Sequence, residues 1–178
     1  MFAAGHPARR IRTSLATLGL AALVAGCAGY RLGPTNSMTA GSRSIQVNPF
    51  ANDTTEPRLA DAVTSSLRKQ LQHDGTYQLD THNEGDIIVT GHVKRFDRLY
   101  LTFEPRDVVT PRDFRVLMTA HVVATDRLTG RKLLDREVIG HSTVRVTADL
   151  PSVERQAVPL IAEDLARNIT ALLVDGTW

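Results

Sequence analysis

The chain is poor in cysteine and lacks the short motifs that mark many enzymes. Cys27 is its only cysteine, so no internal disulfide can form. No Gly-x-Ser-x-Gly elbow, no glycine-rich phosphate loop and no Cys-x-x-Cys spacing occurs. These absences argue against nucleophilic catalysis, phosphate-loop nucleotide binding and a zinc site built from one segment. We therefore predict no catalytic residues, no metal and no dissociable cofactor.

The chain also lacks a second apolar run of membrane length. Its one candidate stands near the N-terminus, where three arginines within residues 9–12 precede the apolar stretch Leu15 to Ala25. That stretch is too short to span a bilayer as a helix, but it has the layout of an export signal. It is followed by Gly26 and then Cys27, and this ending resembles the bacterial lipobox. We predict a lipoprotein signal peptide over 1–26 and a covalent lipid on Cys27; the alternative is an uncleaved leader with an incidental thiol.

An excess of basic charge is also missing once the leader is set aside. The full chain carries 21 Lys and Arg against 19 Asp and Glu, for a net charge of +2. Three of the basic residues precede Cys27 and no acidic residue does, so the remainder carries 18 basic against 19 acidic residues. Phosphate-backbone binding needs a basic excess on the folded surface, so we expect no nucleic-acid partner.

Residues after Cys27 divide into a tether and one domain. Residues 27–43 are rich in Gly, Ser, Thr and Asn and predict a flexible tether behind the lipidated N-terminus. A short strand is expected from Ser44, where Ile45 and Val47 alternate with polar residues. The remaining length, 44–178, suffices for one hydrophobic core.

Two segments predict amphipathic helices. Apolar residues recur every fourth position from Leu59 to Leu71, and Gly75 after Asp74 supplies a left-handed stop, which predicts a helix of about sixteen residues. A second helix is expected over Ser152 to Val174, with a kink or restart at Pro159.

Between the helices, three stretches rich in β-branched residues predict a meander. They run over Asp86 to Phe103, Phe114 to Asp126 and Lys132 to Thr147, with a short strand at Tyr77 to Leu79 before them. Prolines in 104–111 predict a long first connection, and 126–130 a tight hairpin turn. The order strand, helix, meander, helix predicts an α+β fold, a two-layer sandwich with two helices packed on one face of a small mixed β-sheet.

Three histidines and several basic residues share a phase on the meander strands. His92, His121 and His141 would line one sheet face if the registers match, which leaves a metal site open against the simpler interpretation of a solvated polar face. The same phase predicts an anion-contacting set on that face, diluted by Asp135 and Glu137. Its members are Lys94, Arg115 and Arg145, with Arg98 also possible.

Six segments spread over the chain after Cys27 carry a family resemblance. They are Gly29–Leu32, Ile45–Asn52, Glu56-Pro57 at the start of a helix, Asp86–Val93, Asp126–Leu134 and Ala162–Ile169. Together they resemble the LptE family of lipopolysaccharide (LPS)-assembly lipoproteins.

The resemblance implies a non-enzymatic protein of the Gram-negative envelope. Such proteins are lipid-anchored in the outer membrane, face the periplasm, plug a large β-barrel translocon (LptD-like) and assist LPS transport and assembly. LPS phosphates would then be the anions that Lys94, Arg115 and Arg145 contact, although no family motif covers these three residues.

Two other classes stay open. The first half of the pattern also resembles periplasmic modules such as activator lipoproteins of cell-wall synthases and the N-terminal domain of TolB, whose partner would be a synthase or another envelope complex. A metal-dependent enzyme built on the three histidines is a third alternative.

Overall fold

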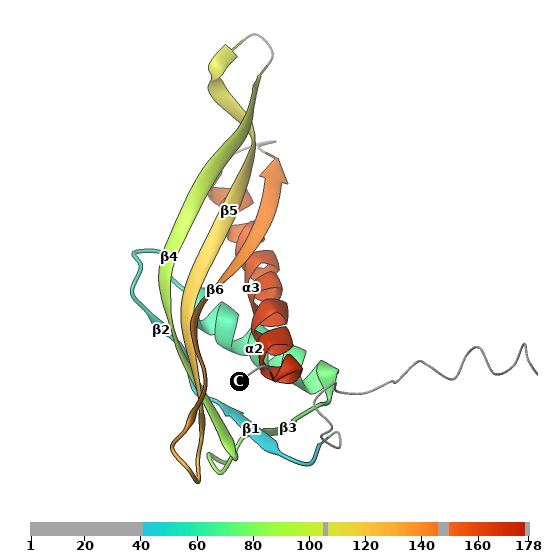
Figure 1. The fold of residues 1–178 in the computed structure, drawn as a ribbon. Coiled ribbons are helices and arrows are strands. Elements are labelled where there is room, and N and C mark those ends of the chain that lie inside the picture. Colours follow the sequence, from blue (N-terminus) through green and yellow to red (C-terminus); the bar gives the residue numbers. More distant parts are fainter. Residues whose placement is uncertain (1–40, 105–106, 146–149, 177–178) are drawn as a thin grey trace, which may run out of the picture. The chain divides into compact units, whose positions relative to one another are not determined.

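The computed structural model describes residues 41–104, 107–145 and 150–176 (Figure 1). The predicted leader over 1–26 and the predicted lipidation site Cys27 lie outside these residues, as does the tether over 27–43 except for its last three positions. The elements are β1 (Ser44–Val47), β2 (Ala51–Asn52), α2 (Leu59–Asp74), β3 (Gln78–Asp80), β4 (Ile87–Glu104), β5 (Asp107–Asp126), β6 (Lys132–Arg145) and α3 (Leu150–Asp175).

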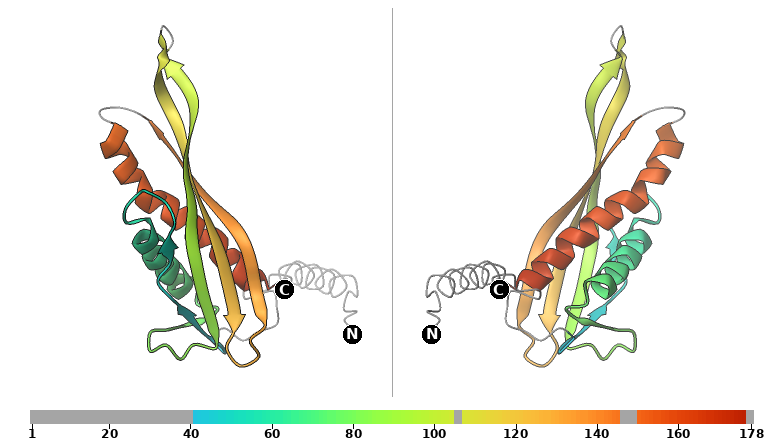
Figure 2. Two further views of the ribbon diagram at one scale, coloured as in Figure 1. Left: turned by 90° about the vertical axis from the view of Figure 1, so that its left-hand side faces the viewer. Right: turned by 90° about the vertical axis from the view of Figure 1, so that its right-hand side faces the viewer.

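The strands form one mixed sheet in the order β3-β1-β4-β5-β6, with β2 paired to β4. β1 runs parallel to β3 and β4, whereas β4, β5 and β6 form an antiparallel meander. Both helices lie on the same face of this sheet (Figure 2). The predicted α+β two-layer sandwich, strand, helix, meander, helix, is therefore confirmed.

The core lies between the sheet and the helices, and strand β5 shows it best. Every even-numbered residue from Phe114 to Ala124 is fully buried, whereas the odd-numbered residues of that span are only partly buried, with the exception of Thr119. This period of two is what a strand with one helix-covered face requires. The apolar stripe of α2 and the inner side of α3 cover the buried row.

Both helices form where their sequence pattern predicts. α2 ends at Gly75, whose φ of 74° is left-handed and whose N–H donates to the Leu71 carbonyl at 3.1 Å. α3 continues through Pro159, so the predicted restart does not occur. Among the described helices, none is long and apolar enough to cross a membrane.

Two glycines mark places where layers approach too closely for a side chain. A Cβ on Gly91 would stand 2.2 Å from the Phe50 ring, which packs over β4 there. A Cβ on Gly140 would stand 2.6 Å from Leu165 Cβ and 2.7 Å from the Ile161 carbonyl oxygen. α3 therefore lies directly on β6 at Gly140.

The predicted long connection between the first two meander strands is wrong. β4 and β5 stay paired as far as Glu104 and Asp107, so most of 104–111 belongs to strands. Pro111 pairs with Phe103 at a place where the register of β4 and β5 shifts. This part of β5 lies beyond its last pair with β6, Asp113 with Arg145, so Pro111 stands on an edge strand, where a proline is tolerated.

Candidate functional site

The face of the meander opposite the helices is the candidate site. Among the described elements, none packs over this face of β4, β5 and β6, which we call the uncovered face (Figure 2). Its side chains come from odd-numbered residues of β5 and β6, which pair in register from Asp113 with Arg145 to Val123 with Asp135.

The three predicted histidines all lie on this face but do not form one site. His92 stands directly opposite His121, whereas His141 pairs with Leu117, four residues further along β5. Each imidazole faces a different aspartate. The pairs are His92–Asp53 at 3.5 Å, His121–Asp135 at 2.9 Å and His141–Asp164 at 3.3 Å.

These pairs leave the metal hypothesis without support. In the part of the chain that the structure describes, no group of three or more His, Cys, Asp or Glu residues is placed to hold a metal ion. Each histidine instead contacts one carboxylate.

Two of the three predicted anion-contacting residues already form ion pairs with carboxylates of the protein itself. Lys94 Nζ lies 2.6 Å from Asp53 Oδ2, and this hydrogen bond is the main cause of the lowered pKa of Asp53. Arg145 Nε lies 2.9 Å from Asp113 Oδ1, and the same contact raises the pKa of Arg145. Both cations are therefore neutralised by partners within the protein.

Arg115 differs from them. It stands between Leu99 on β4 and Thr143 on β6, and it makes no ion pair with another residue that the structure describes. Its Nε is buried and has no hydrogen-bond partner. A guanidinium that has lost part of its water without gaining an acceptor favours any anion that can reach it.

The position predicted for Arg98 is wrong. A β-bulge between Val93 and Arg95 reverses the alternation of β4, so Arg98 pairs with Val116 and lies on the helix side of the sheet. There its Nη2 lies 3.0 Å from Glu56 Oε1. The same bulge brings Arg95 onto the uncovered face, where it pairs loosely with Glu137 at 3.4 Å.

The sequence interpretation also missed an apolar patch beside Arg115. Leu99 and Ile139 are 52% and 49% exposed, and Leu117 lies between them, diagonal to both across the strands. Diagonal neighbours on an antiparallel face are about 7–8 Å apart, within reach of long side chains. We call Leu99, Leu117 and Ile139 the apolar diagonal; only the reversed alternation after the bulge could have indicated it.

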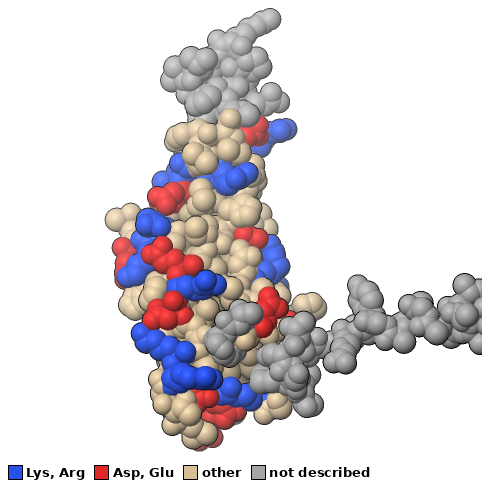
Figure 3. Space-filling view, viewed as in Figure 1, with Lys and Arg blue, Asp and Glu red and all other residues tan. Residues whose placement is uncertain are grey.

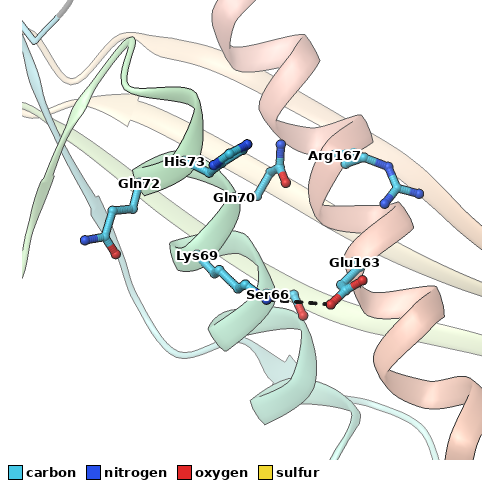
Figure 4. Close-up of a pocket in the computed structure, with 7 residues that line it drawn as sticks. All are labelled: Ser66, Lys69, Gln70, Gln72, His73, Glu163 and Arg167. Carbon is cyan, nitrogen blue, oxygen red and sulfur yellow. Dashed lines mark ion pairs between the residues drawn. The ribbon is translucent and has the colours of Figure 1, made fainter.

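A hollow lies between the two helices, away from the uncovered face. It has a volume of about 530 Å³ and is lined by polar side chains of both helices (Figure 4). Lys69 and Glu163 face each other across it at 3.9 Å. The charged residues that line this hollow are of both signs. On the molecular face drawn in Figure 3, acidic and basic residues are likewise interspersed and do not form one basic patch.

Compared with known families, the chain matches the family described as LptE, lipopolysaccharide-assembly, over residues 42–173. No curated protein matches the chain.

Solved structures share the fold at low identity. A hypothetical protein of Chlamydia trachomatis has a TM-score of 0.55 and 9% identity, with 78% of this chain and 98% of that one covered. A protein of Xanthomonas campestris has a TM-score of 0.52 and 12% identity, with 81% and 92% covered.

Proposed function

The chain belongs to the LptE family of lipopolysaccharide-assembly lipoproteins, and we propose that it partners an LptD-like β-barrel translocon in delivering LPS to the outer membrane. The observation that carries this proposal is the family match over nearly the whole described domain, residues 42–173. Because the family acts in assembly and not in catalysis, we also propose that the chain is not an enzyme.

Cys27 would anchor the protein on the periplasmic side of the outer membrane. Its place at the end of an export signal supports acylation, and each buried methylene of an acyl chain contributes about 0.8 kcal/mol to membrane binding. Labelling cells with radioactive palmitate should mark the wild-type protein and leave a Cys27→Ser variant unlabelled. Labelling of both proteins would rule out this site.

The uncovered face is the surface that we propose for LPS contact. Lys94, Arg115 and Arg145, predicted as anion contacts, all come from the strands that form it. The helix face of the sheet is filled by the core and offers no comparable surface.

Depletion of the protein in its own bacterium tests the function. We expect surface-exposed LPS to fall while total LPS stays constant, and re-expression of the wild-type chain to restore it. If the chain instead activates a cell-wall synthase, peptidoglycan cross-linking would change and surface LPS would stay normal, which would overturn the proposal.

A further inference from the structure

Arg115 stands out from the other basic residues of the uncovered face. Lys94, Arg95 and Arg145 each lie within 4 Å of a carboxylate, at 2.6, 3.4 and 2.9 Å. Arg115 has no such partner among the described residues, and its Nε is buried without an acceptor. Among the residues that the structure describes, Arg115 therefore provides a positive charge that no carboxylate neutralises.

The surroundings of Arg115 are apolar on two sides. Leu99 on β4 stands directly opposite Arg115, and Leu117 lies two residues after Arg115 on β5, on the same face. With Ile139 they form the apolar diagonal, two members of which are about half exposed. Exposed apolar area of this kind gains free energy when covered, at about 25 cal/mol per Å².

Two carboxylates stand near enough to compete for Arg115. Asp113 is held by Arg145 at 2.9 Å, and it cannot neutralise a second cation fully. Asp97 lies opposite Leu117, diagonal to Arg115, and no ion pair joins them. Asp97 should therefore weaken anion binding without abolishing it.

We propose that Arg115 and the apolar diagonal form a binding site for one phosphorylated lipid. The phosphate oxygens would accept charge-assisted hydrogen bonds from the Arg115 guanidinium, and an acyl chain would lie along Leu99, Leu117 and Ile139. Lys94 and Arg145 have a different task, which is to hold Asp53 and Asp113. The inference narrows the three-residue contact of the proposed function to one residue, but it stands on the geometry alone and needs no barrel partner.

Calorimetric titration of the full lipidated protein in a neutral detergent tests this site. The probes are lipid A, the same lipid A stripped of phosphate, phosphatidylglycerol and inorganic phosphate. We expect the two phosphorylated lipids to bind more tightly than dephosphorylated lipid A and inorganic phosphate. Whichever phosphorylated lipid binds more tightly identifies the source as glycolipid or glycerophospholipid.

Matched variants separate the roles of the basic residues. Arg115→Gln should weaken binding of the phosphorylated lipid about tenfold, and Arg115→Lys by less, because it keeps the charge but loses the planar fork. Lys94→Gln and Arg145→Gln should change the affinity less than about twofold, which is a smaller change than the loss of one charged hydrogen bond to the ligand would cause. Asp97→Asn should strengthen binding.

Circular dichroism and thermal unfolding should show that Arg115→Gln folds like the wild type. Equal affinity of wild type and Arg115→Gln would overturn the proposal, and so would equal affinity for lipid A with and without phosphate. Failure to find a barrel partner would contradict the proposed function and leave this site intact.

Discussion

The two faces of the meander use neighbouring residues of the same strand for opposite purposes. On β5, Phe114 is fully buried under the helices, and Arg115 beside it stands on the uncovered face with a buried, unpartnered Nε. Side chains on the helix face are chosen by packing, because each one fills space between two layers. Side chains on the uncovered face have no such constraint and remain available for ligands.

The uncovered face itself changes character along the strands. Around the row of His92, His121 and Glu137, each of these side chains lies within 4 Å of an ionisable partner on the same surface. Toward the far end, Arg115 and Leu99 stand in the same row. Among the described residues, the buried Nε of Arg115 has no hydrogen-bond partner, and Leu99 is half exposed. The uncovered face therefore pairs its polar side chains at the end with His92 and His121. It leaves a cation beside leucines at the end with Arg115 and Leu99, and this second end is where we place the recognition site.

The sharpest test of the comparison between faces is truncation of one apolar side chain on each. Phe114→Ala should lower the free energy of unfolding by about 3–5 kcal/mol, because it leaves a large cavity under the helices. Leu99→Ala, on the uncovered face, should cost about 1 kcal/mol or less. Urea unfolding measures the free energy of unfolding of both variants. Comparable losses in the two would mean that another element covers the uncovered face.

The contact of α3 with β6 should be almost as sensitive. Gly140→Ala places a Cβ against Leu165 and the Ile161 carbonyl, and we expect a loss of about 1–3 kcal/mol from overpacking. Thr143→Ala, exposed on the same strand, is the control and should be nearly neutral. Thermal unfolding measures both variants, and a Gly140→Ala protein that unfolds at the wild-type temperature would refute the close approach.

A smaller effect is expected where α3 closes the free edge of β6. Asp164 accepts a hydrogen bond from the His141 N–H at 2.9 Å, and Asn168 donates to the Ile139 carbonyl at 2.9 Å. Replacing both by Ala should cost about 1–2 kcal/mol and expose an edge that can pair with another chain. Sedimentation velocity should then show self-association, and a variant that stays monomeric at high concentration would contradict this role.

The smallest effect concerns the turn between β5 and β6. Backbone and side-chain hydrogen bonds from Thr129, and then Arg43, lower the pKa of Asp126 from 3.8 to about 2. Because the folded pKa lies below the unfolded one, the stabilisation is complete above pH 3.8 and is lost as the pH falls toward 2. Asp126→Asn should therefore show a shallower loss of stability in that window, and an unchanged slope in acid titrations would exclude the contribution.

The parts of the fold that follow from local pattern could be predicted from the sequence. The leucine spacing and Gly75 determine α2, and the alternation of 114–124 determines which side of β5 is buried. The bulge beside Lys94 could not be foreseen, since its neighbours alternate as in a regular strand. That one extra residue reversed the face of Arg98 and concealed the apolar diagonal.

The candidate site was foreseeable in outline only. Lys94, Arg115 and Arg145 were predicted to share a face, but sequence phase could not tell paired cations from the free one. The partner of Lys94, Asp53, stands forty-one residues away along the chain and reaches it only through the pairing of β2 with β4. Charge pairing of this kind depends on tertiary structure and leaves no local pattern.

The central claim, a translocon partner, is tested most directly by recovering that partner. The lipidated, affinity-tagged protein should be crosslinked in cells and purified from outer-membrane extracts, with Cys27→Ser as the unanchored control. The account predicts an equimolar large β-barrel protein with the wild type and much less with the control. Recovery of a peptidoglycan synthase, or of no barrel, would contradict it.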